Sequence, residues 1–112
     1  MKQTDTERLQ TILHIWEGLS RQIAERGITP ELLLKDEFTQ WAVTTPLYNI
    51  GEQVYQISVD FKNRHPDIPW NMVSGLRHRL VHNYEGINWS IIVEVVFHEM
   101  DDFVRQIAEI IS

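Results

Sequence analysis

The chain has 112 residues, no cysteine and a formal net charge of −6, which predicts one domain over residues 1–112 without disulfides or a Cys-ligated metal site. The negative charge argues against broad, non-specific binding to nucleic acid, because such a field repels phosphates. The sequence contains neither a signal-peptide core nor the ~18 consecutive apolar residues of a membrane helix, so we expect a cytoplasmic protein without a membrane partner.

The first predicted helix begins at a capping box and ends at a glycine. Thr4 and Glu7 have the spacing at which each side chain satisfies a free backbone amide of the first turn. Gly27 supplies a natural stop, and a short second helix follows over residues 30–34, because Thr29 can cap it and Pro30 suits its first position. The first helix carries apolar residues that step by three and four and so share one face: Leu9, Ile12, Trp16, Leu19 and Ile23.

A long third helix is predicted from Asp36 to about Asn63. Pro46 lies inside it, and predicts either a kink near residues 42–46 or a break into two helices. The apolar stripe continues through the proline, which favours the kink. This stripe consists of Val43, Leu47, Ile50, Val54, Ile57 and Phe61.

Two more helices follow a proline-containing connector at residues 65–70. The first should begin near Pro69 and end in the turn at residues 83–86. The second is capped by Asn88 and carries one apolar stripe from Trp89 to Ile110, which predicts either core or a dimer interface. Since no strand pattern is present, we predict an all-α, up-and-down bundle of about four to five helices. The first of these two helices carries Met72, Val73, Leu76, Leu80 and Val81 as its apolar residues.

Positive charge is concentrated in one segment of this acidic chain. Residues 62–82 contain four basic side chains against Asp67 alone, a net charge of +3 that leaves −9 for the rest. Such a segment suits an enzyme that meets phosphate at one place, or a surface that docks an acidic partner. An ordinary charge fluctuation in a small protein would also account for it.

Several parts of the sequence resemble the HepT-like HEPN family. Its R-x-x-x-x-H-x-Y motif is matched by Arg77, His82 and Tyr84, preceded by Ile68-Pro69-Trp70, and its long helix is matched by Ile50-Gly51-Glu52. The resemblance spans about residues 33–104 and implies a HEPN-type helical bundle. His78 stands where the family usually has Asn, and Asn83 stands where it usually has Gly.

The resemblance also implies a function. It implies a metal-independent endoribonuclease toxin without a cofactor, acting as a homodimer whose two motifs face a shared cleft. The implied partner is a nucleotidyltransferase antitoxin. Arg77 and His82 would be the catalytic pair, and Tyr84 would be the residue that the antitoxin modifies with AMP.

The chemistry of these side chains fits that expectation. Histidine, with an unperturbed pKa of ~6.5, suits a base that removes the 2'-hydroxyl proton of RNA, and the planar fork of arginine suits the phosphate. We therefore hypothesise that His82 is the general base or acid and Arg77 the phosphate clamp, with Arg79 as an auxiliary contact. Each residue also has a purely structural alternative. The arginines could be solvated charges on the helix surface, His82 could be a histidine favoured at a helix C-terminus, and Tyr84 could cover the end of the bundle.

Two further side chains are candidates for auxiliary or RNA-binding roles. Glu52 lies off the apolar stripe, where it could orient an arginine or histidine of the motif or be an ordinary surface carboxylate. His78 lies four residues before His82, a metal-ligand spacing, but no third ligand is visible and we predict no metal site.

The main functional prediction is a toxin ribonuclease that cleaves tRNA or mRNA. The alternative is a non-catalytic HEPN module that binds nucleotide or scaffolds a minimal nucleotidyltransferase. A third interpretation is a helical bundle whose basic segment docks an acidic protein.

Overall fold

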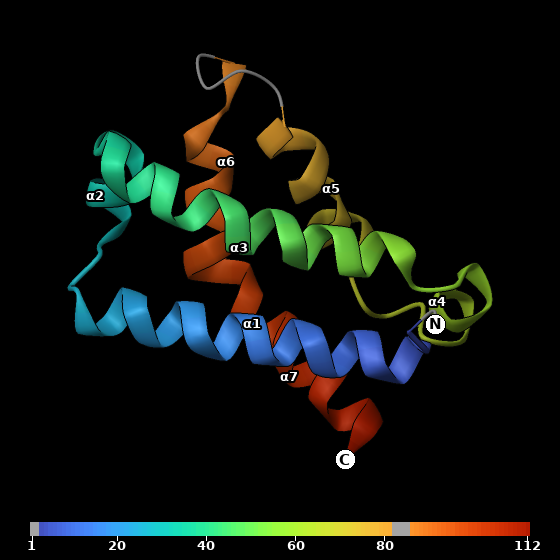
Figure 1. The fold of residues 1–112 in the computed structure, drawn as a ribbon. Helices are drawn as coiled ribbons and strands as arrows, with labels where there is room; N and C mark the ends of the chain where they lie inside the picture. Colours follow the sequence, from blue (N-terminus) through green and yellow to red (C-terminus); the bar gives the residue numbers. More distant parts are fainter. Residues whose placement is uncertain (1–2, 82–85) are drawn as a thin grey trace.

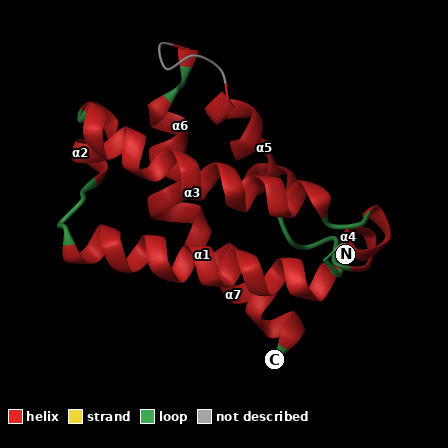
Figure 2. Ribbon diagram, viewed as in Figure 1, coloured by secondary structure: helices red, strands yellow, loops and turns green. Residues whose placement is uncertain are grey.

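The computed structural model describes residues 3–81 and 86–112, and every regular element among them is helical (Figures 1 and 2). In chain order these are α1 (Asp5–Glu25), α2 (Pro30–Lys35), α3 (Glu37–Gln56), α4 (Val59–Arg64), α5 (Trp70–Val81), α6 (Trp89–Glu94), a π-helical turn (Val95–Glu99) and α7 (Met100–Ile111). The predicted all-α bundle of the HEPN type is confirmed.

The helices pack around one shared core. The chain runs in opposite directions along α1 and α3, which lie side by side, while α5 packs against α3 (Figure 1). The run from α6 to α7 crosses this pair, with α6 contacting α2 and α7 contacting α1. The predicted apolar stripes of α1, α3 and α5 therefore face the same interior, and most of their members are buried.

The predicted helix starts are confirmed by their capping contacts. Thr4 Oγ1 accepts the amide of Glu7 at 3.1 Å while Glu7 Oε1 accepts the amide of Thr4 at 2.8 Å. Thr29 caps α2 with Pro30 at its first position, and Asn88 Oδ1 accepts two amides of α6. Gly27 follows α1 with a φ of 63°, a left-handed conformation that glycine adopts without steric cost.

The predicted long helix from Asp36 to Asn63 is wrong in its second half. The helix continues through Pro46 without a break, but α3 ends at Gln56 and α4 begins at Val59. Ser58 has extended backbone angles, and its Oγ accepts the amide of Phe61, which starts a new helix. The apolar stripe stays buried on both sides of this junction, so hydrophobic periodicity alone does not reveal the break.

The structure also decides two points that the apolar stripes left open. Val81, grouped with the apolar residues of its helix, is 57% exposed at the end of α5. The last helix contains the π-helical turn, and its stripe is core: Ile92, Val96, Met100, Phe103 and Ile107 are all buried within one chain. Of the two predicted alternatives, core or dimer interface, these five residues are core. The predicted end of α5 in the turn at residues 83–86 lies mostly outside the described residues.

No helix among residues 3–81 and 86–112 is both long and apolar enough to span a membrane.

Candidate active site

Arg77 is held by a carboxylate from the facing helix. It lies on α5, and its Nε donates to Oε2 of Glu52 on α3 at 2.8 Å. Both side chains are about one-third exposed, at 35% for Arg77 and 33% for Glu52. The contact uses Nε, so the terminal nitrogens of the guanidinium lie outside it. A partly buried cation fixed in this way is suited to meeting an anion that arrives from solvent.

Gly51 explains why α3 and α5 approach so closely here. A Cβ atom built on Gly51 would lie 2.7 Å from the backbone nitrogen of Arg77 and 3.2 Å from its Cβ. It would also lie 3.2 Å from the carbonyl oxygen of Val73, one turn earlier on α5. Only glycine leaves room for this backbone contact. The sequence Gly51-Glu52 thus supplies both the close approach and the carboxylate that the approach brings to Arg77.

A tyrosine covers one face of the guanidinium. Cζ of Arg77 lies 4.0 Å from the ring centroid of Tyr55, a cation–π geometry. Tyr55 is 54% exposed, so its ring borders solvent while it limits the rotation of the guanidinium. Glu52 and Tyr55 together restrict both the position and the plane of the Arg77 side chain.

The surroundings keep this pair charged. A hydrogen bond from Gln56 is the largest cause that lowers the pKa of Glu52 below its ordinary value, followed by the hydrogen bond from Arg77. The hydrogen bond to Glu52 in turn raises the pKa of Arg77. Tyr48 adds a smaller hydrogen-bond contribution to Glu52. An ionised Glu52 partnered with a cationic Arg77 is therefore the state at neutral pH.

The structure brings together only some of the predicted site residues. Arg77 and Glu52 are in contact, but Arg79 is not part of this contact. Two residues along an α-helix correspond to a rotation of about 200°, so the Arg79 side chain lies on nearly the opposite side of α5 from Arg77. His78 and Arg79 are both exposed to solvent. His82 and Tyr84 lie outside the described residues, so their placement relative to Arg77 stays a prediction.

Three residues of this site were missed by sequence reasoning. Tyr48, Tyr55 and Gln56 lie four residues before, three after and four after Glu52, which are the steps at which helix side chains are neighbours. The sequence signal for these three residues is therefore their three- and four-residue spacing from Glu52, an acidic residue that lies off the apolar stripe. Without knowledge that α5 packs on this face, the spacing alone did not connect them to Arg77.

Aromatic side chains continue along the same side of α3. Phe38, Trp41, Tyr48 and Tyr55 fall within about 100° of one another around an ideal helix, on the face that also carries Glu52. Phe38 is 72% exposed and Trp41 is 49% exposed. We call these four residues the outer face of α3. Tyr55 is also exposed, whereas Tyr48 is partly buried against the core. Exposed large apolar side chains that gather on one face are typical of an interaction surface.

No group of three or more His, Cys, Asp or Glu side chains within the described ranges is placed to hold a metal ion.

The fold and the motif helix define a HEPN-type helical bundle. The family model "Ribonuclease HepT-like" matches residues 5–110, and the chain belongs to this family. It is similar to a candidate RNase of Methanocaldococcus jannaschii, with 40% identity over 76% of this chain and 70% of the relative. It is also similar to a candidate RNase of Caldanaerobacter subterraneus subsp. tengcongensis, with 33% identity over 93% of this chain and 91% of the relative.

A third relative carries the family's own name. The candidate ribonuclease HepT of Thermococcus cleftensis is 34% identical over 86% of each chain. No solved structure matches the chain.

Proposed function

We propose that the chain is a metal-independent endoribonuclease of a toxin–antitoxin pair, acting in the cytoplasm on tRNA or mRNA. The observation that carries this proposal is the restrained guanidinium of Arg77, held by Glu52 and stacked on Tyr55. The family and the RNase names of its relatives support the same reaction class. An arginine whose position and plane are fixed before the substrate arrives loses little freedom on binding phosphate.

The proposed reaction needs one base, one acid and one fixed cation. His82 takes the proton of the ribose 2'-hydroxyl, and the 2'-oxygen attacks phosphorus. The bond from phosphorus to the 5'-oxygen breaks, and that oxygen takes a proton from a solvent water molecule, which serves as the acid. The products are a 2',3'-cyclic phosphate and a free 5'-hydroxyl. Arg77 stabilises the negative charge that develops on the phosphoryl oxygens, with His78 and Arg79 as auxiliary RNA contacts.

Glu52 has a positioning role in this proposal. Glu52 contacts Arg77 rather than the substrate, and the two side chains form an ion pair. Glu52→Gln should therefore weaken cleavage without abolishing it, because the amide can still accept the Nε hydrogen bond. A readout beyond activity is the acid dependence of folding stability, which should change in this variant.

We propose a homodimer that meets through the outer face of α3. Most of the stripe on the last helix is inside the core. This leaves the outer face of α3, with its exposed Phe38, Trp41 and Tyr55, as the better surface for a self-complementary contact. Light scattering should give a dimer mass for the wild type and a monomer mass for Trp41→Glu. Val59→Glu is the matched control, because Val59 is 72% exposed on α4 and lies off this face. A wild-type monomer would contradict the dimer.

We further propose that a nucleotidyltransferase antitoxin inactivates the enzyme by transferring AMP to Tyr84. The family membership supports this step. Mass spectrometry after co-expression with such an enzyme should find one added AMP on Tyr84, and none in Tyr84→Phe. Modification elsewhere, or none, would remove this part of the proposal.

The main experiment is RNA cleavage in the presence of EDTA. Wild type and Arg105→Ala should cleave, since Arg105 is an exposed arginine on α7, whereas Arg77→Ala and His82→Ala should not. Circular dichroism must show that each variant remains helical. Undiminished cleavage by His82→Ala would refute its assignment. No cleavage of tRNA or mRNA by any of the proteins would instead support a non-catalytic module that binds nucleotide or scaffolds a nucleotidyltransferase.

A further inference from the structure

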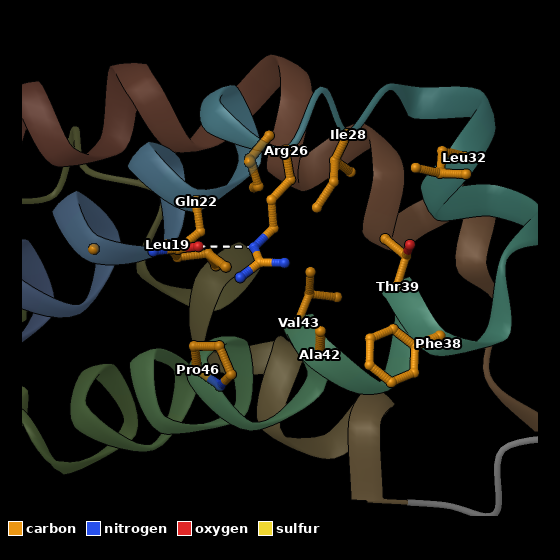
Figure 3. A pocket seen from close by; sticks show the side chains of 12 residues that line it. Leu19, Gln22, Arg26, Ile28, Leu32, Phe38, Thr39, Ala42, Val43 and Pro46 are labelled. Carbon is orange, nitrogen blue, oxygen red and sulfur yellow. Dashed lines mark hydrogen bonds between the residues drawn. The ribbon is translucent and has the colours of Figure 1, made fainter.

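A cleft lies away from Arg77, between the last turns of α1 and the first half of α3. It is a cleft of about 630 Å³, with Ile28 and Leu32 bordering it where the chain passes into α2 (Figure 3). Val43 lies in its wall, nine residues before Glu52, a distance of about 13 Å along an α-helix. The cleft is therefore separate from the candidate active site.

Small side chains keep this cleft open. Gly18 and Ala42 lie in its two main walls. A Cβ atom built on Gly18 would meet nothing within 4 Å, so the space beside it is not filled by neighbouring residues. Pro46 also borders the cleft, and because proline has no amide hydrogen it cannot pair with the carbonyl of Ala42 one turn earlier. Larger residues at these positions would close the space.

The chemistry of the cleft is apolar with one cation. Leu19, Ile23 and Val43 form apolar walls, and Arg26 is the one charged side chain among its lining residues. Figure 3 shows the guanidinium of Arg26 reaching over the cleft toward Val43 and Ala42. Its Nε donates to Oε1 of Gln22 at 2.8 Å, a hydrogen bond between two exposed side chains that favours this direction.

These features select one class of ligand. A cleft of several hundred Å³ with apolar walls and a few polar groups is typical of small-molecule sites. A single arginine complements a single negative charge, whereas a nucleoside polyphosphate or an RNA backbone needs several cations. We propose that this cleft binds small amphipathic anions, with an apolar body of roughly 10 to 20 non-hydrogen atoms and one carboxylate or sulfonate directed at Arg26.

The test uses the full chain and two matched probes. Naphthalene-2-sulfonate carries the anion, and 2-naphthol has the same ring system but is uncharged at pH 7. Titration followed by amide NMR should shift the signals of Gly18 and Thr39, with a dissociation constant of about 100 μM for the sulfonate and weaker binding of 2-naphthol. Shifts confined to other parts of the molecule would overturn the proposal.

Two variants and two controls locate the binding. Arg26→Gln should weaken sulfonate binding by about tenfold and leave 2-naphthol unchanged, because one charge-assisted hydrogen bond is lost. Arg21→Gln makes the same charge change on an exposed residue of α1 outside the cleft and should bind as wild type. Equal affinities of these two variants for the sulfonate would overturn the role of Arg26.

Ala42→Leu should fill the cleft and abolish binding of both probes. Ala24→Leu is its control, since Ala24 is exposed on α1 and does not line the cleft. Unchanged binding by Ala42→Leu would overturn the proposal. Because no RNA is used, the result does not depend on ribonuclease activity.

Discussion

Gly51→Ala should destabilise the protein although alanine is normally the better helix residue. The added Cβ would lie 2.7 Å from the Arg77 backbone nitrogen, about 0.7 Å closer than the 3.4 Å at which ordinary van der Waals contact begins. The obstructing atoms are mainly backbone of α5, so a rotamer change cannot relieve the clash, and the helices must separate. Overpacking of this kind costs about 1–3 kcal/mol, against a helix-propensity gain of roughly 0.5–1 kcal/mol. We expect a net loss of about 1–2 kcal/mol.

The assay is thermal and urea unfolding followed by circular dichroism at one fixed protein concentration. The expected loss lowers the melting temperature by roughly 4–10 °C for a chain of this size. Gly75→Ala is the control, because a Cβ on Gly75, within α5, would meet nothing within 4 Å. That variant should gain about 0.5–1 kcal/mol. If Gly51→Ala were as stable as Gly75→Ala, the proposed close packing of α3 on α5 would be refuted.

Three further predictions concern a cap, the core and the effect of acid. Thr4→Ala should cost about 1 kcal/mol in urea unfolding, since its hydroxyl caps α1; an unchanged midpoint would show that the cap contributes little. Phe103→Ala should cost about 3–5 kcal/mol, because the ring is fully buried, and a loss under 1 kcal/mol would contradict its central position. The lowered pKa of Glu52 means that its ionised form stabilises the fold above the ordinary glutamate pKa of about 4.3, and this contribution disappears as pH falls further. Glu52→Gln should therefore lose less stability than wild type between pH 5 and pH 2, and parallel pH profiles would argue against this linkage.

Helix starts could be predicted well from the sequence because their signals are local. A capping side chain and the amide that it accepts are only two or three residues apart, as with Thr4, Thr29 and Asn88. The core positions of α1 and α3 followed from spacing for a similar reason, since the helical repeat is fixed. Gly27 and Pro30 were equally informative, because their backbone preferences do not depend on distant neighbours.

Features that depend on contacts across the fold were harder to predict. The break after Gln56 relies on Ser58, which has the local signal of a helix cap but lies within an uninterrupted apolar stripe. Val81 has an apolar side chain, and only the packing of α5 decides that it faces solvent. In the candidate active site, the motif indicated Arg77, but Tyr55 is recognised only once α3 and α5 are known to lie against each other.

The junction between α3 and α4 is tied to the start of α1. Asp5 accepts the backbone amide of Ser58 at 2.9 Å and its hydroxyl at 2.7 Å, across 53 residues of sequence. An exposed connection between two helices is ordinarily a preferred site of proteolytic cleavage. Because these two hydrogen bonds hold Ser58 against the first turn of α1, we expect cleavage near residue 58 to become faster when that turn detaches.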